Sequence, residues 1–146
     1  MPIQYIDCRD LANWMLHAAD EGISGPFNAV SKPGHATMGS LLEAAVATIG
    51  SEANLVWVDP EVIDEAGIEA WTELPVWIQP YGEGAALHDG DVSAIYAAGL
   101  VCRPVEETVA DTWAWLQAEG DPPVPEGRPS HGLDPDRERE VLGSLR

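Results

Sequence analysis

The chain has 146 residues, 45% of them hydrophobic and six of them tryptophan, which is enough for one domain with a packed core. Its formal net charge is -18 and Lys32 is its single lysine, so it lacks the clustered cations that binding to nucleic acid requires, and anionic membranes are disfavoured for the same reason. No apolar run approaches the roughly 20 residues that span a bilayer, so no membrane partner is expected.

Hydrophobic periodicity predicts strands that alternate with helices along the chain. Short runs of β-branched and aromatic residues predict strands at 3–6, 27–30, 54–58 and 100–103. Helices are predicted between a capping residue and a glycine at 7–22, 37–50, 59–67 and 91–99, and a fifth begins at Pro104. The pattern therefore predicts an α/β fold with a small three- to four-stranded sheet and about five helices.

Composition divides the chain into three parts. Residues 1–119 form the predicted α/β domain, 120–133 a linker rich in proline and glycine, and 134–146 a charged C-terminal helix. Cys8 and Cys102 lie far apart in the sequence and form no C-x-x-C pair, so free thiols are expected and a disulfide is the alternative. The first residues show no signal-peptide pattern, and we expect a cytoplasmic protein.

Six segments between Ile3 and Leu116 carry a family resemblance. They are Ile3-Gln4-Tyr5-Ile6-Asp7-Cys8-Arg9-Asp10-Leu11-Ala12, Gly25-Pro26-Phe27-Asn28-Ala29-Val30, Thr37-Met38-Gly39-Ser40-Leu41-Leu42, Asp91-Val92-Ser93 with Ala98-Gly99-Leu100, Arg103-Pro104, and Glu107-Thr108 leading to Trp113-Ala114-Trp115-Leu116. In this order and spacing they resemble the C-terminal, substrate-side half of extended short-chain dehydrogenases/reductases, in the NAD-dependent epimerase/dehydratase and reductase-like group. The resemblance implies a truncated lobe whose sheet is mostly parallel, with 1–119 as the substrate-lobe-like domain.

The residues that would run this family's redox chemistry are absent from the sequence. No glycine-rich turn follows the first predicted strand, so nothing here would hold a cofactor pyrophosphate. The Tyr-x-x-x-Lys pair is missing as well, because Asn28 stands four residues before Lys32. We therefore expect no cofactor in this chain alone, and NAD or NADP only if a cofactor-binding half is supplied. A split or truncated gene product, an artificially shortened chain and a free-standing descendant with a new role all fit this pattern.

His88 and Asp91 are the candidate catalytic residues. Nucleotide-sugar epimerases carry Arg-x-x-Asp at the matching place, and here His88 replaces the arginine while Asp91 is kept. A neutral imidazole cannot replace the guanidinium fork, so the resemblance with this change disfavours a diphosphate substrate. His88 is either a substrate contact or general acid/base, or a loop histidine beside a capping aspartate.

Five further residues are candidate substrate contacts. Trp71, Trp77 and Tyr81 are predicted either to line a pocket for a small apolar or aromatic ligand, or to be the core of an irregular lobe or an interface patch. His35 follows the second predicted strand, near Lys32, and Arg103 either binds a substrate carboxylate or pairs with Glu106 or Glu107. The histidines show no metal-ligand spacing, so no metal site is predicted.

Three hypotheses about function follow from these features. The first is a substrate-lobe domain without autonomous NAD-dependent redox activity, which binds a small molecule or a partner. The second is a recruited non-redox enzyme, an isomerase, cyclase or lyase, that uses His88 or Asp91. The third is a fragment or split subunit of an NAD-dependent epimerase or reductase. An uncovered sheet edge predicts either a homo-oligomer or pairing with a separately encoded cofactor-binding half.

Overall fold

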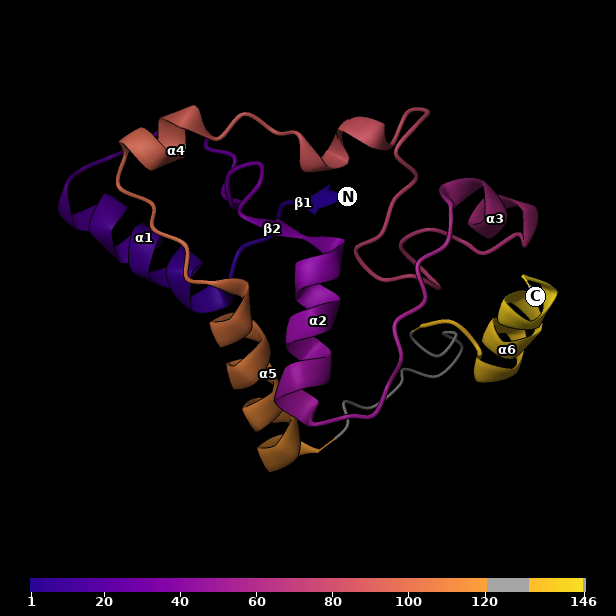
Figure 1. Cartoon of the computed structure of the whole chain (residues 1–146). Coiled ribbons are helices and arrows are strands. Elements are labelled where there is room, and N and C mark those ends of the chain that lie inside the picture. Colours follow the sequence, from indigo (N-terminus) through magenta and orange to yellow (C-terminus); the bar gives the residue numbers. More distant parts are fainter. Residues whose placement is uncertain (121–131, 146) are drawn as a thin grey trace, which may run out of the picture. The chain divides into compact units, whose positions relative to one another are not determined.

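The computed structural model describes residues 1–120 and 132–145 of the chain (Figure 1). The described part is mostly helical. Its helices are α1 (Cys8–Asp20), α2 (Met38–Ile49), α3 (Pro60–Glu65), α4 (Ser93–Ala97), α5 (Val105–Glu119) and α6 (Pro135–Ser144), with a 3-10 turn at Ala85–His88. Two short strands, β1 (Pro2–Ile3) and β2 (Ala36–Thr37), pair antiparallel, with Pro2 opposite Thr37 and Ile3 opposite Ala36.

The predicted α/β class, with three or four mostly parallel strands, is wrong. Within residues 1–120 and 132–145 the one sheet is the antiparallel pair β1–β2. A parallel sheet requires neighbouring strands that exchange several main-chain hydrogen bonds in register, and the other predicted strands do not pair in this way within those residues. The structure is therefore a helical assembly with a minimal sheet.

The segment 27–30 shows why a strand-like sequence does not become a strand here. The Val30 N–H turns back to the Asn28 carbonyl (3.1 Å), which bends the main chain. The next residue, Ser31, then donates a single main-chain bond to the Tyr5 carbonyl (2.7 Å). Phe27 packs edge-on against Trp14, with ring centroids 5.1 Å apart. The apolar residues of this segment therefore pack against the core, although the segment forms no β-ladder with another strand.

Two of the predicted caps, Asp7 and Thr37, bind the helices that follow them, whereas Asp59 makes no side-chain cap bond to α3 and Val92, not the predicted Asp91, is the N-cap of α4. Asp7 caps α1 by accepting from the Arg9 N–H (2.9 Å). Thr37 and Ser40 form a capping box at the start of α2, and Gly50 ends that helix in the left-handed conformation (φ 66°). Asp134 caps α6 in the same manner as Asp7 caps α1. These ends were predictable because a cap and its helix are neighbours in sequence.

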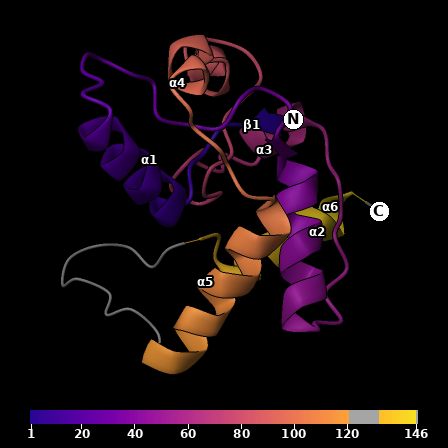
Figure 2. The same ribbon diagram turned by 90° about the vertical axis from the view of Figure 1, so that its left-hand side faces the viewer.

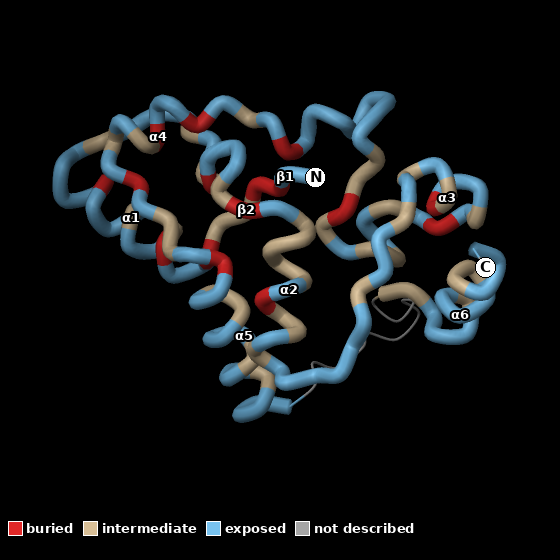
Figure 3. Tube along the Cα trace, in the orientation of Figure 1, coloured by how far each residue is buried: buried red, intermediate tan, exposed pale blue. Residues whose placement is uncertain are grey.

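The chain divides into two compact units. The first comprises Met1–Ala53 and Ala86–Gly120, and the second Asn54–Ala85 with the described C-terminal residues 132–145. In the first unit α2 packs along α5, and the two helices lie side by side in both views (Figures 1 and 2). A cluster of buried Val92, Ile95 and Leu100 forms its core, against which Trp14 and Phe27 pack. Buried positions also mark β1 and β2 (Figure 3).

In the second unit, one arginine binds α6 to the residues around the end of α3. Arg137 pairs with Glu73 and donates to the carbonyls of Ala66 and Gly67, at the C-terminal end of α3. A cation at a helix C-terminus satisfies carbonyls that have no partner within the helix. Ile63, Ile68 and Trp77 are the buried apolar residues of this unit. The predicted C-terminal helix therefore docks, whereas most of the predicted linker lies outside the described residues.

No helix in the described part of the chain is both long enough and apolar enough to cross a membrane.

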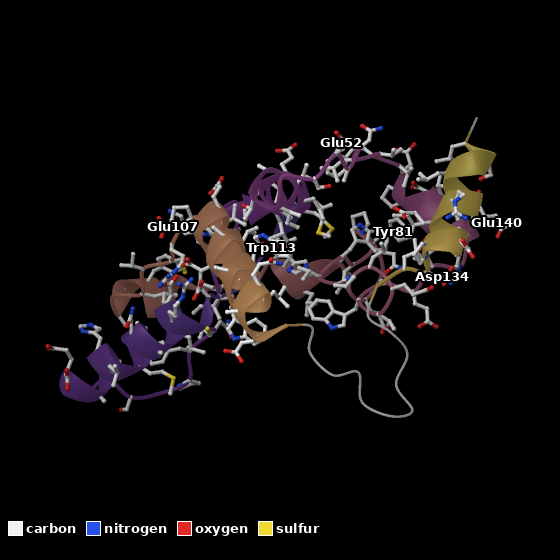
Figure 4. The ribbon with its side chains drawn as sticks, turned by 90° about the horizontal axis from the view of Figure 1, so that it is seen from below. Glu52, Tyr81, Glu107, Trp113, Asp134 and Glu140 are labelled. Atoms are coloured by element: carbon white, nitrogen blue, oxygen red, sulfur yellow. The ribbon has the colours of Figure 1, made fainter. Side chains whose placement is uncertain are left out.

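The surface of both units is rich in carboxylates. Glu52, Glu107, Asp134 and Glu140, labelled in Figure 4, are all exposed.

A buried ion-pair network joins α1 to the residues before α5. Arg103 donates to the Asp10 carboxylate through its backbone N–H (2.9 Å), Nε (2.9 Å) and Nη2 (2.7 Å), and its Nε lies 3.5 Å from Asp7. The Asp7 and Asp10 side chains are only 5% and 8% exposed. Hydrogen bonds from Arg9 hold the pKa of Asp7 far below its usual range. Burial raises the pKa of Asp10, but the bonds from Arg103 outweigh it and the net pKa is lowered.

This network predicts acid-sensitive stability. Because the folded-state pKa values of Asp7 and Asp10 lie below the unfolded value of about 3.9, their contribution is present above that pH and is lost as pH falls below about 4. Asp10→Asn should lower the free energy of unfolding at pH 7 by about 3 kcal/mol, because it leaves Arg103 poorly paired. Asp10→Asn should also reduce the loss of unfolding free energy between pH 7 and pH 3 (the acid limb), measured by urea unfolding at each pH. Asp20→Asn, at an exposed position of the same helix, is the control. Equal acid limbs in the two variants would contradict the prediction.

Candidate functional site

A pocket of about 510 Å³ in the first unit gathers several polar residues that the sequence singled out. Two chain segments form its walls: Lys32 and Pro33 on one side, and residues 89–93 with Tyr96 on the other. Lys32, Asp89, Asp91 and Ser93 are all exposed, so their polar groups are accessible to a ligand. The structure thus brings together two predicted features, the loop after 27–30 and the cluster around Asp91.

Gln4 holds the two walls at their spacing. Its side-chain Nε2 donates to the Ser31 carbonyl (2.9 Å) and to the Gly90 carbonyl (3.0 Å), and its Oε1 accepts from the Gly90 N–H (2.6 Å). Gln4 is buried. A Cβ on Gly90 would stand 3.3 Å from Gln4 Oε1, so this close approach favours glycine. One buried amide therefore links the residue before Lys32 to the residue before Asp91.

Tyr96 forms a second link between the walls. Its hydroxyl accepts from the Lys32 N–H (3.1 Å) and donates to Cys102 Sγ (3.3 Å). Burial is the main cause that raises the pKa of Tyr96 to about 12, and burial also raises the pKa of the Cys102 thiol. Both groups stay protonated near neutral pH, so Tyr96 is a fixed hydrogen-bonding wall and Cys102 a structural thiol.

Asp91 is an anchored carboxylate. Its Oδ1 accepts from the Ser93 N–H (2.9 Å), and its carbonyl accepts from the Asn28 side chain (2.8 Å). The Ser93 backbone N–H and then its side chain lower the pKa of Asp91, which is therefore ionised at neutral pH. An ionised aspartate can accept hydrogen bonds from ligand hydroxyls or ammonium groups, and the Lys32 ammonium can meet a ligand carboxylate. These groups suit the binding and orientation of a small polar molecule.

His88, the other candidate catalytic residue, is not part of the lining of this pocket. It is buried, and its Nδ1 accepts from the Gln4 backbone N–H (3.0 Å), which places the proton of the neutral ring on Nε2. This bond ties His88 to the residue that follows β1. The geometry gives His88 a positioning role beside Gln4.

The other predicted contacts in the first unit are held by internal bonds. Arg103 pairs with Asp10 and Asp7, and its side chain is 19% exposed. His35 contacts the Arg103 carbonyl through Nε2 (3.0 Å) and packs near Tyr5, with ring centroids 6.0 Å apart. These residues join the Asp10 network, which lies apart from the lining of the pocket. Sequence reasoning had left a pairing of Arg103 with Glu106 or Glu107 open; the partners are aspartates some 93 positions away along the chain.

The aromatic candidates lie in the second unit. Trp77 is 9% exposed and belongs to the core, whereas Trp71 is 55% exposed and Tyr81 41% exposed. The Trp71 N–H donates to the Trp77 carbonyl (3.0 Å), and the Tyr81 hydroxyl donates to Asp64. This bond to Asp64 raises the pKa of Tyr81 to about 12. Trp71 therefore has the most exposed ring of the three.

Gln4 and Tyr96 are the site residues that sequence reasoning missed. Gln4 stands in a predicted strand and Tyr96 in a predicted helix, and neither pattern identifies the distant groups that the residue binds. A glutamine in an otherwise apolar predicted strand was the one signal that could have been followed, since buried polar groups need partners.

No group of three or more potential metal ligands is found among the residues that the structure describes. No family model, no curated protein and no solved structure matches the chain.

Gln4→Met provides a test of the link between the walls. Methionine keeps the side-chain length but leaves the Gly90 N–H and the Gly90 and Ser31 carbonyls without this partner, and each buried unpaired group costs about 1–3 kcal/mol. We expect the free energy of unfolding in urea to fall by about 3 kcal/mol. Gln117→Met, at an exposed position on α5, is the matched control and should change it by less than about 0.5 kcal/mol. A similar loss in both variants would exclude a special role for Gln4.

Proposed function

We propose that the chain is a substrate-side binding lobe, related to extended short-chain dehydrogenases/reductases, that binds a small polar molecule and has no NAD-dependent redox activity of its own. The observation that carries the proposal is a pocket whose lining contains Lys32, Asp91 and Ser93, on two chain segments that Gln4 joins. Such a pocket suits a small hydroxylated carboxylate. Lys32 would take the carboxylate, while Asp91 and Ser93 would take the hydroxyl groups.

The relationship to this family is proposed on the resemblance of the six sequence segments. All six segments belong to the first unit. Arg103 bonds to Asp10, the Thr108 hydroxyl donates to Asp7 (2.9 Å), and Asn28 donates to the Asp91 carbonyl. Residues that are spaced along the sequence as in the family are thus packed against one another. We place the protein in the cytoplasm, where Cys8 and Cys102 stay as free thiols.

The proposal has a second part, a partner that supplies a cofactor-binding half. Residues 27–30 and 54–58 have strand-forming sequences but no strand partner within the described residues. In the second unit, Val56 and Trp57 of the latter segment are 50% and 59% exposed. Such a segment can gain hydrogen bonds by adding to the sheet edge of another chain. The net charge of -18 opposes close approach of a second copy, so we favour a separate protein over a homo-oligomer.

Calorimetric titration with NAD(H) and NADP(H) tests the absence of autonomous redox function. We expect no heat of binding, because the sequence has no glycine-rich turn to hold a pyrophosphate. Tight binding of either cofactor by this chain alone would overturn the proposal.

Ligand binding is tested by NMR titration with small hydroxy acids such as glycerate. We expect saturable shifts at Lys32, Ser93 and Tyr96, and their loss in Lys32→Gln, because the variant removes the pocket's cation. Arg139→Gln makes the same change of charge at an exposed position in α6 and should bind as the unmodified protein does. Shifts that persist in Lys32→Gln, or that map elsewhere, would refute the assigned pocket.

Light scattering over a wide concentration range separates the two kinds of partner. We expect a monomer, because like charges oppose self-association, and a slight rise in association as salt screens them. A stable dimer at low salt would instead favour the homo-oligomer.

A further inference from the structure

A second pocket, of about 500 Å³, lies in the first unit between the start of α1 and one face of α5. On the α5 side it is lined by Thr108, Asp111, Thr112 and Trp115, whose spacing of three and four residues places them along one stripe of the helix. On the α1 side its lining includes Asp7 and Arg9. None of these residues belongs to the lining of the Lys32 pocket, so the two sites are independent.

Arg9, which lines this pocket, and Arg103, which lies outside the lining, are both anchored by buried carboxylates. Arg9 donates to Asp7 through Nε (2.9 Å) and Nη2 (2.7 Å), and Arg103 donates to Asp10 through Nε and Nη2. In each case the same two nitrogens of the guanidinium bind the buried acid. The orientation of both planes is therefore set by bonds within the protein, and the Nη1 atoms are left for another acceptor.

The two Nη1 atoms converge on one carboxylate, that of Asp111. Arg9 Nη1 donates to Asp111 Oδ2, and Arg103 Nη1 lies 3.9 Å from the same oxygen. Asp111 differs from the other two acids of the network, because its side chain is 52% exposed whereas those of Asp7 and Asp10 are buried. An exposed ion pair contributes little to stability, so this carboxylate can be exchanged at small cost.

Trp115 places an apolar surface beside the exchangeable carboxylate. It lies one helical turn beyond Asp111 on the same stripe of α5 and is 54% exposed. A large exposed aromatic residue next to two oriented guanidinium groups matches a ligand with a planar apolar body and one carboxylate.

We propose that this pocket is a binding site for small aromatic carboxylates and that Asp111 masks it. The ligand's carboxylate takes the place of Asp111 on Arg9 and Arg103, and its ring packs on Trp115. The network of two arginines and three aspartates carries one net negative charge, which opposes an incoming anion. Because Asp111 is tethered beside the arginines, it competes at a high local concentration.

The mask predicts that Asp111→Asn binds an aromatic carboxylate more tightly than the unmodified protein does. The probe is 2-naphthoate, followed by NMR shifts of Trp115 and of the residues around it. We expect affinity to rise at least about tenfold, because the variant frees both Nη1 atoms and removes one repelling charge. Asp20→Asn makes the same change of charge at an exposed position of α1 and should leave the affinity unchanged within about twofold.

Two further variants and a neutral probe make the test decisive. In the Asp111→Asn background, Arg9→Gln should reverse the gain, and 2-naphthalenemethanol should bind equally weakly with or without Asp111. Should Arg9→Gln fail to fold, Trp115→Leu leaves both arginines intact and should weaken 2-naphthoate binding about tenfold. Equal affinity of the unmodified protein and Asp111→Asn, or full binding by Asp111→Asn that also carries Trp115→Leu, would overturn the proposal.

Discussion

The first unit depends on the buried ion pair between Asp10 and Arg103, which joins residues 93 positions apart in the sequence. It fixes the start of α1 against the residues that lead into α5, and Thr108 extends the contact by donating to Asp7. Removing one partner of such a pair leaves a buried charge uncompensated, so the pair specifies the arrangement even though its net contribution to stability is small. The position of the pocket between the start of α1 and α5, which Arg9 and Trp115 line, follows from this constraint.

Polar side chains do in this structure what a sheet would do in an α/β protein. A ladder holds segments together with regularly spaced main-chain bonds, but β1 and β2 contribute only two residues each. The amide of Gln4 and the hydroxyl of Tyr96 instead bind main-chain groups at single points, Gly90 and Ser31 in one case and Lys32 in the other. A loop that is bound at one residue leaves the polar groups of its other residues exposed. The Lys32 pocket lies between two such loops.

Features that depend on neighbouring residues could be predicted from the sequence, whereas features that depend on distant residues could not. Asp7 and Thr37 were identified as helix caps, and Asp134 as the start of the last helix, because each of these signals acts on the next few residues. The predicted strands at 27–30, 54–58 and 100–103 did not form, because strand formation depends on a distant partner that no local pattern reveals. The site divides in the same way: Lys32 and Asp91 were each noticed in their own loops, whereas the Gln4 bridge between those loops requires knowledge of the tertiary structure.

Charge limits what the Lys32 pocket could bind. Neither Arg9 nor Arg103 is in the lining of this pocket, and Lys32 is the cation of that lining. Asp89 and Asp91 lie in the same lining, which leaves the pocket with one net negative charge. A diphosphate would bring at least two more negative charges against a single ammonium group, whereas one carboxylate could be balanced by Lys32 while hydroxyl groups met the aspartates. His88 is buried, accepts from the Gln4 N–H and is not part of the lining, so it adds no phosphate-binding group to the pocket. The ligand that suits this arrangement is a small hydroxylated monoanion.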